Sequence, residues 1–237
     1  MKGDRGKLAG RRVVITGVSR GVGLEVAKRF LAEGAEILGV ARSRANLARA
    51  DRTLKAHGKA YSSLLADVSL PTSAARVAAA VQRRWGALDL LVNNAAVNPG
   101  SAPFERDRDL EATLRVNVLG PHRMTKALLP MLKRGHHPRV VNLSSGAGNF
   151  HSVSTGTDMS AYRFSKWSLN GLTMLWAAEL KGRVSVVAMD PGWVKTDMGG
   201  PSAPDSPTLS AQRALEIALL PFEVTGKYLA GAKEGSW

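Results

Sequence analysis

The sequence RVVITGVSRGVG, residues 12–23, carries the strongest local signal in the chain. Its β-branched first half is typical of a strand, and Val22, Val26 and Phe30 then recur at helical spacing. Glycines separate the two parts. A strand that passes through such a turn into a helix is the first half of a βαβ unit, so the stretch predicts an α/β fold with a parallel sheet.

The rest of the chain repeats this alternation of strand and helix. Strands are expected at residues 12–16, 37–40, 64–66, 88–92, 140–143, 184–189 and 228–230. A long helical stretch at 107–132, interrupted near Gly120, is expected before the fifth strand, and a helix at 210–220 before the last. Most strands are continuous apolar runs, as in a sheet covered on both faces. We therefore predict one domain, residues 1–237: a Rossmann-type, doubly wound parallel sheet of about seven strands with helices on both faces.

Composition removes several classes of function. The chain has no cysteine, which excludes a disulfide scaffold, a cysteine metal site and a thiol nucleophile, and its five histidines show no metal-binding spacing, so we expect no metal. The formal charge of +14 suits an anionic partner. Aromatic residues make up only 5% and are not interleaved with basic runs, which argues against a nucleic-acid partner.

No membrane partner is expected either. No apolar run approaches the roughly 18 residues of a membrane span, and the basic start of the chain lacks the apolar segment of a secretory signal. These observations predict a soluble cytoplasmic protein.

Polar residues and glycines collect where the expected strands end. They occupy residues 16–23, 41–43, 67–68, 93–95, 144–145 and 190–192. Ligands of doubly wound sheets bind at the carboxyl ends of the strands, so these segments predict the site.

The first of these segments places Gly17, Gly21 and Gly23 between a strand and a helix. Glycine lets the backbone approach a ligand closely, and a helix N-terminus favours a phosphate. Residues 17–21 also fit the G-x-S-x-G elbow of serine hydrolases, but that fold needs strands upstream of the elbow. The segment lacks the lysine of a P-loop.

Five motifs in order resemble the short-chain dehydrogenase/reductase family. They are Thr16-Gly17-x-x-x-Gly21-x-Gly23, Asn93-Asn94-Ala95-Ala96, Ser144-Ser145, Tyr162-x-x-x-Lys166 and Pro191-Gly192-x-Val194-x-Thr196. The last motif and the residues after it look most like the carbonyl-reductase-like members. One departure is Ala96, where the family usually has glycine; we expect it to be tolerated. The resemblance implies hydride transfer between a nicotinamide cofactor and a carbonyl or secondary alcohol.

Tyr162 and Lys166 are the expected centre of that chemistry. They lie four residues apart in an expected helix at residues 162–180 and so share a face. A nearby ammonium and the positive ring of an oxidised cofactor favour tyrosinate and lower the tyrosine pKa from its usual value of about 10. Tyr162 then acts as general acid or base near neutral pH. The resemblance implies that Lys166 also binds the nicotinamide ribose.

Ser145 and Asn117 complete the catalytic set that the resemblance implies. Ser145 hydrogen-bonds the substrate carbonyl, and Asn117 holds a water in a proton relay; a lone polar residue in a buried helix is the alternative for Asn117. Ser145 precedes Tyr162 by 17 residues, a longer spacing than usual in the family, which we assign to a polar loop at residues 152–158. The spacing leaves Ser144 as the alternative to Ser145.

The end of the expected second strand predicts the choice of cofactor. NAD-specific members usually place an acidic residue there, whereas this chain has Arg42 and Ser43. Arg42 can fork onto a 2′-phosphate, and Arg20 is the second basic residue expected in members that prefer NADP. We therefore expect NADP(H) to be favoured over NAD(H). The expected cofactor-binding residues are Gly17, Ser19, Arg20, Gly21, Val22, Gly23, Arg42, Ser43, Asp67, Val68, Asn93, Ala95, Val116, Tyr162, Lys166, Pro191, Gly192, Val194 and Thr196.

The sequence thus predicts an NADP(H)-dependent reductase or dehydrogenase of a small molecule. The alternative is a relative of the fold that senses NADP(H) without turnover, although such relatives typically lose the Tyr–Lys pair. The resemblance also implies a homo-oligomer, a dimer or tetramer, commonly formed through the helix that bears Tyr162.

Overall fold

A computed structural model describes residues 6–57, 60–100 and 106–237 of the chain. Its strands are β1 (Arg12–Thr16), β2 (Glu36–Ala41), β3 (Tyr61–Leu65), β4 (Leu90–Asn93), β5 (Arg139–Leu143), β6 (Ser185–Met189), β7 (Tyr228–Ala230) and β8 (Lys233–Glu234). They form one sheet in the order β3-β2-β1-β4-β5-β6-β7-β8. The first seven strands run parallel, which confirms the predicted doubly wound sheet, and β8 adds an antiparallel edge beside β7.

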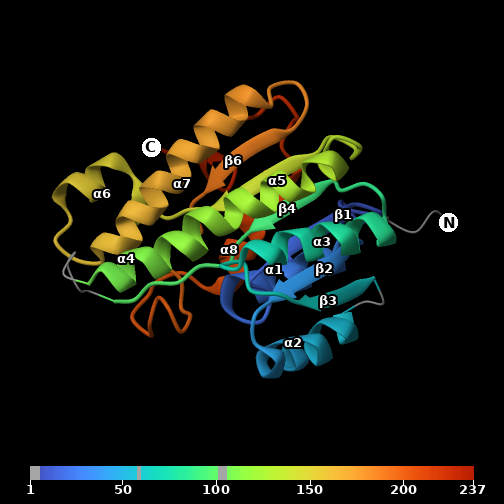
Figure 1. Cartoon of the computed structure of the whole chain (residues 1–237), viewed down its shortest axis with the longest axis horizontal. Coiled ribbons are helices and arrows are strands. Elements are labelled where there is room, and N and C mark those ends of the chain that lie inside the picture. Colours follow the sequence, from blue (N-terminus) through green and yellow to red (C-terminus); the bar gives the residue numbers. More distant parts are fainter. Residues whose placement is uncertain (1–5, 58–59, 101–105) are drawn as a thin grey trace.

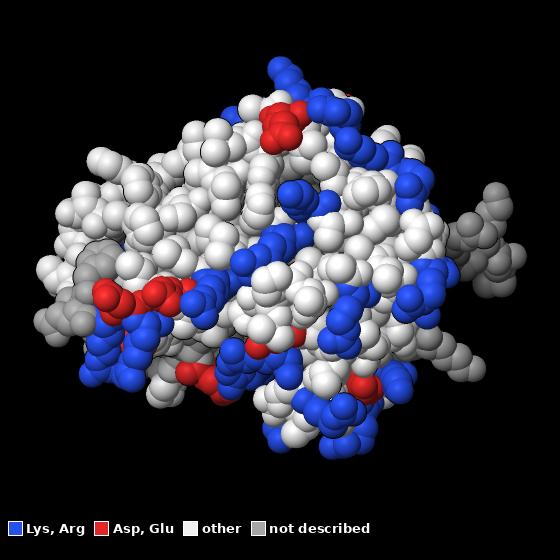
Figure 2. Space-filling model, viewed as in Figure 1, with Lys and Arg blue, Asp and Glu red and all other residues white. Residues whose placement is uncertain are grey.

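Helices cover both faces of this sheet (Figure 1). One face carries α1 (Gly21–Ala32), α2 (Arg44–His57) and α8 (Pro207–Leu219), and the other carries α3 (Pro71–Arg84), α4 (Asp107–Leu114), α5 (Gly120–Leu132) and α7 (Ser160–Glu179). Among the described residues, no helix is both long enough and apolar enough to cross a membrane. Figure 2 shows Lys and Arg side chains over much of the face that carries α3, α5 and α7, where acidic side chains are fewer.

The central strand β1 shows why the apolar runs are continuous. Successive side chains of a strand point to opposite faces, so Val13 and Ile15 pack in the cluster with α1 and α8. Val14 packs in the other cluster, with α3 and α5. All three side chains are fully buried. Both faces of the strand therefore require apolar residues, as the sequence pattern indicated.

Three elements differ from the prediction. Strand β3 begins at Tyr61 rather than 64, because its middle holds Ser62 and Ser63, which break the apolar run. The stretch at 107–132 continues through Gly120: a π-helical turn, η1 (Arg115–Leu119), joins α4 directly to α5. Proline at the second position of α5 is tolerated in a first helical turn.

The third difference lies before α7, where the polar loop expected at residues 152–158 is partly wrong. A short helix, α6 (Phe150–Thr155), occupies its first part. The Asn149 side chain starts this helix by accepting a hydrogen bond from the Ser152 N–H at 2.7 Å. Arg163 ties the segment to α7 through the Ser152 carbonyl at 3.1 Å and the Asp158 carboxylate at 2.5 Å.

Candidate active site

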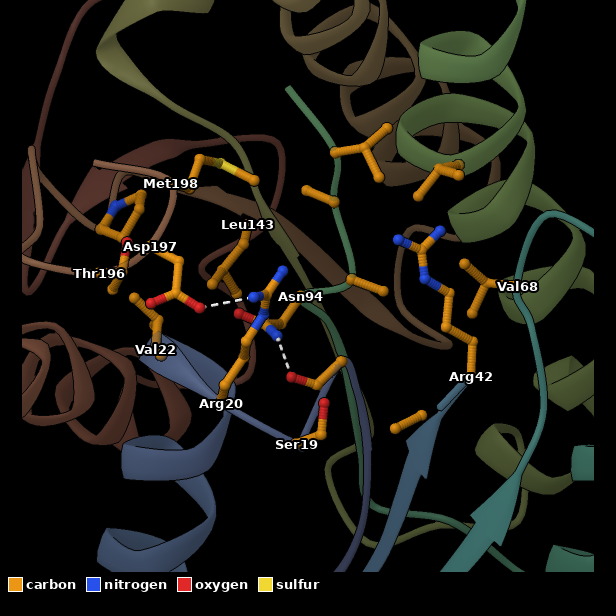
Figure 3. A pocket seen from close by; sticks show the side chains of 18 of the residues that line it. Ser19, Arg20, Val22, Arg42, Val68, Asn94, Leu143, Thr196, Asp197 and Met198 are labelled. Carbon is orange, nitrogen blue, oxygen red and sulfur yellow. Dashed lines mark hydrogen bonds and ion pairs between the residues drawn. The ribbon is translucent and has the colours of Figure 1, made fainter. Parts of the chain in front are cut away.

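A cavity of about 430 Å³ opens at the carboxyl ends of the parallel strands, in the position expected for a ligand of this fold (Figure 3). Of the predicted residues it is lined by Gly17, Ser19, Arg20, Gly21, Val22, Arg42, Asp67, Val68, Ala95, Val116, Tyr162, Lys166, Pro191 and Thr196. The turn after β1, the ends of β2 and β3, the segment after β4, helix α7 and the loop after β6 thus meet around one space.

Other predicted residues stand behind this wall. They are Gly23, Ser43, Asn93, Asn117, Ser145, Gly192 and Val194. Asn93 departs furthest from its prediction, because its side chain is buried and donates to Asn142 Oδ1 at 2.9 Å and Thr125 Oγ1 at 3.3 Å. The Asn93 side chain therefore lies in the core, and it is the next residue, Asn94, that lines the cavity.

Asn94 holds the glycine turn in place. Its amide Nδ2 donates to the carbonyl oxygens of Thr16, at 2.8 Å, and Gly17, at 3.1 Å. Gly17 has a φ of +71°, which favours glycine. A Cβ on Gly23 would overlap the Asn94 amide and the Gly17 carbonyl, so the first turn of α1 needs glycine there too. The turn thereby brings the backbone N–H groups at the N-terminus of α1 to the cavity.

Two arginines line the same cavity from different strands. Arg42, just after β2, makes no hydrogen bond or ion pair with the described part of the chain, and Figure 3 shows its guanidinium reaching into the space. Arg20, just before α1, pairs with Asp197. Ser43 does not line the cavity, and its Oγ accepts from the Asn46 N–H at 3.4 Å, at the start of α2.

On α7, Tyr162 and Lys166 present the same face to the cavity, as their spacing predicts. The buried Lys166 Nζ donates to the Leu143 carbonyl at 2.7 Å and lies 5.5 Å from the centre of the Tyr162 ring. Burial disfavours the ammonium and lowers the pKa of Lys166 to about 8.

The pKa of Tyr162 moves opposite to the expectation. This pKa is raised to about 12: burial raises it most, a hydrogen bond with Ser145 lowers it, and the Asp190 carboxylate raises it. Tyr162 therefore keeps its proton at neutral pH in this structure.

The structure separates the two candidate serines. Ser144 lines the cavity but is buried, and its hydroxyl donates to Asn170 Oδ1 at 2.5 Å. Ser145 is partly exposed and does not line the cavity; its Oγ accepts from the Ala147 N–H at 3.2 Å, and its side chain acts to lower the pKa of Tyr162. The hydrogen bond that ties up the Ser144 hydroxyl favours Ser145 as the serine of the site, and α6 accounts for the long spacing between Ser145 and Tyr162.

Asn117 lies in the π turn, and its side chain forms hydrogen bonds with other parts of the chain. Its Oδ1 accepts from the Val97 N–H at 2.9 Å, and its Nδ2 donates to the Val97 carbonyl and to Ser165 Oγ, both at 2.9 Å. The side chain is fully buried and does not reach the cavity. It ties the segment after β4 to the helices that cover it.

The loop after β6 contributes residues beyond those expected to bind the cofactor. Lys195, Asp197 and Met198 line the cavity, although only Thr196 of these four was predicted as a cofactor contact. The preceding turn is anchored at Gly192, which has a φ of +87° and no room for a Cβ beside the Asp205 carboxylate.

Arg213 of α8 also holds this turn in place. Its Nη1 donates to the Pro191 carbonyl and to Asp205 Oδ2, both at 2.9 Å. The sequence signal for this turn is a glycine directly after a proline. No local pattern predicts that Asp197 lines the cavity. Within the described ranges, no three His, Asp or Glu side chains come together as metal ligands.

The sheet order and the cavity define a Rossmann-type protein whose site carries a Tyr–Lys pair. A family model described as short chain dehydrogenase matches residues 11–207. The chain therefore belongs to the short-chain dehydrogenase/reductase family of NAD(P)-dependent oxidoreductases, which confirms the resemblance found in the motifs.

Individual relatives agree with this assignment. The human protein named Dehydrogenase/reductase SDR family member 4 is 33% identical, over 81% of this chain and 69% of its own. Carbonyl reductase Sniffer of D. melanogaster has a TM-score of 0.88 at 28% identity, covering 97% of this chain and 100% of its own. NADPH-bound carbonyl reductase from chicken fatty liver has a TM-score of 0.84 at 26% identity, covering 98% and 96%.

Proposed function

We propose that the protein is an NADP(H)-dependent reductase of small carbonyl compounds, which also oxidises the corresponding secondary alcohols. One observation carries this proposal: Tyr162, Lys166 and Ser145 meet beside a cavity that also holds the glycine turn and Arg42. The structural likeness to an NADPH-bound carbonyl reductase supports it.

The residues present fit a dinucleotide. The cavity lies within the volume range of small-molecule sites, and Gly23 leaves no space for a Cβ under the turn that would cradle the pyrophosphate. Asp67 and Val68 would contact the adenine, and Arg42 a 2′-phosphate. Val116, Ala95, Pro191 and Thr196 would line the remaining length, with Gly192 and Val194 shaping the wall from behind. The nicotinamide, when bound, supplies or accepts the hydride.

This chain's own residues handle the proton. The Tyr162 hydroxyl donates a proton to the carbonyl oxygen during reduction, and the Ser145 hydroxyl donates a hydrogen bond to the same oxygen. A tyrosine pKa near 12 keeps that proton in place at neutral pH, the state that reduction requires. The Lys166 ammonium, held by the Leu143 carbonyl, stabilises negative charge that develops on the tyrosine oxygen.

Thermal unfolding with NADPH or NADH tests the cofactor site without a substrate. Ligand at about 100 times its dissociation constant stabilises by roughly 2.7 kcal/mol, which raises the Tm of a chain this size by about 5–11 °C. We expect a larger rise with NADPH than with NADH. Equal rises contradict the cofactor preference, and no rise with either contradicts the site.

Arg42→Ala tests the 2′-phosphate contact. Losing a charge-assisted hydrogen bond of about 1.5–3 kcal/mol weakens NADPH binding roughly 10- to 150-fold and leaves NADH binding nearly unchanged. Arg44→Ala is the matched control, because Arg44 is also exposed but does not line the cavity. An equal loss in both variants contradicts a specific contact.

Tyr162→Phe tests the proton donor. The ring remains and the hydroxyl is lost, so we expect NADPH to raise the Tm as in the wild type. Reduction of a panel of aldehydes and ketones falls about 10²- to 10⁴-fold. Turnover close to wild type would remove Tyr162 from this role.

A further inference from the structure

An ion pair spans the cavity between two loops that lie far apart in the sequence. Arg20 Nη1 of the glycine turn and Asp197 Oδ2 of the loop after β6 are 2.5 Å apart, and both residues line the cavity. Figure 3 shows the two side chains directed toward each other. Both remain largely exposed, with 65% and 73% of the side-chain surface accessible. The pair therefore lies at the open side of the cavity, within reach of an entering ligand.

The loop that carries Asp197 is braced by its own hydrogen bonds. The Gly199 N–H donates to Thr196 Oγ1 at 3.1 Å, and the Gly200 N–H donates to the Thr196 carbonyl at 2.8 Å. The Trp193 indole donates to the Gly199 carbonyl at 2.8 Å, which closes the loop on itself. The backbone at Asp197 consequently has a defined position, while the long Arg20 side chain is the member of the pair that is free to change partner.

A phosphate is a stronger partner for Arg20 than Asp197 is. Exposed ion pairs contribute little to stability, because water screens the charges and two side chains must be ordered. A phosphate carries more charge and offers several oxygens to the planar fork of a guanidinium. The carboxylate of Asp197 also repels an anion that enters the same cavity.

We propose that Asp197 competes with a phosphate of the dinucleotide for Arg20 and so sets the affinity of the cofactor site. This inference rests on the proposed function. Arg20 exchanges the carboxylate for the phosphate when the cofactor binds, and Asp197 regains Arg20 when the cofactor leaves. The phosphate is either the 2′-phosphate or the pyrophosphate, and comparison of NADPH with NADH distinguishes the two.

The test measures dissociation constants of the full-length protein by titrating nicotinamide fluorescence at low and at high salt. In Asp197→Asn we expect NADPH to bind roughly 1.5- to 5-fold more tightly at low salt, the range that an exposed pair allows. High salt reduces this gain. The gain disappears in the Arg20→Gln background, because the competition needs the arginine.

Glu25→Gln is the matched control. Glu25 also lines the cavity and carries the same charge, but it pairs with Lys28 at 2.7 Å rather than with Arg20. If simple repulsion of anions caused the effect, Glu25→Gln would tighten binding as much as Asp197→Asn, and the Arg20→Gln background would keep the gain. Either result overturns the proposal.

The remaining outcomes are equally decisive. Tighter binding of NADPH alone assigns the exchange to the 2′-phosphate, and tighter binding of both cofactors assigns it to the pyrophosphate; each supports the competition. Unchanged or weaker binding in Asp197→Asn, with wild-type protein that binds NADPH, overturns this inference alone. Wild-type protein that binds neither cofactor overturns the proposed function and this inference with it.

Discussion

Replacing Asn94 by alanine should loosen the glycine turn on which the cofactor site is built. The change removes two hydrogen bonds, from Nδ2 to the Thr16 and Gly17 carbonyls, in a partly buried setting. At about 0.5–1.5 kcal/mol for each bond, the free energy of unfolding should fall by ~1–3 kcal/mol, equivalent to about 2–12 °C in Tm. Because the Gly17 carbonyl then lacks its amide partner, NADPH should also bind more weakly.

Thermal unfolding followed by circular dichroism measures the first effect, and fluorescence titration with NADPH measures the second. Asn46→Ala on α2 is the control, since no side-chain hydrogen bond ties the Asn46 amide to the described part of the chain; its Tm should change by no more than a surface substitution does, within about 0.5 kcal/mol. If Asn94→Ala matches the control in both measurements, Asn94 does not support the turn.

Three further predictions concern the proton donors, a second turn and the surface. Carbonyl reduction should slow as pH rises through about 8, because the Lys166 side chain loses its charge there, whereas Tyr162 keeps its proton up to about pH 12. A kcat/KM that stays constant from pH ~7 to ~10 contradicts this role of Lys166. Gly192→Ala should lower the free energy of unfolding by about 1–3 kcal/mol, because the residue has a positive φ and its new Cβ would overlap the Asp205 carboxylate. Gly171→Ala in α7 should not destabilise, because a Cβ there meets open space; equal Tm values of the two variants refute the distinction. The apolar side chain of Leu175 on α7 is 66% exposed, so Leu175→Glu should shift the expected homo-oligomer toward monomer, as measured by light scattering. A wild-type protein that is already monomeric contradicts self-association through α7.

The order of strands and helices could be predicted because apolar runs report burial directly. Strand β1 is buried on both faces, and every one of its residues after Arg12 is apolar or β-branched. The apolar pattern indicates the start of β3 three residues too late. Ser62 and Ser63 belong to a strand at the edge of the parallel sheet, where full burial is not required. Helix α6 depends on a local cap at Asn149 and on Arg163, which contacts it from α7; apolar periodicity does not report such contacts.

The site was predictable where chemistry and spacing coincide on one element. Tyr162 and Lys166 share a helix, so their shared face follows from helical geometry alone. Asn93 and Asn94 are neighbours of the same type, and only the end of the ladder between β4 and β5 decides which one turns to the core. Asp197 meets Arg20 across 177 positions of sequence, and no local pattern contains that contact.

The π turn between α4 and α5 makes the length of this segment part of the site. A π turn closes i→i+5 hydrogen bonds and so holds about one residue more than an α turn of about 3.6 residues. Deleting one residue from Arg115–Leu119 would therefore restore a regular helix and leave α4 and α5 in nearly the same relative orientation. The residues inside the turn would shift, so Asn117 would leave Val97 and Ser165, and the segment after β4 would lose its attachment. A single-residue deletion in this turn should therefore spare the flanking helices but loosen the wall of the site, and a designer who regularises the helix must supply another anchor for Val97.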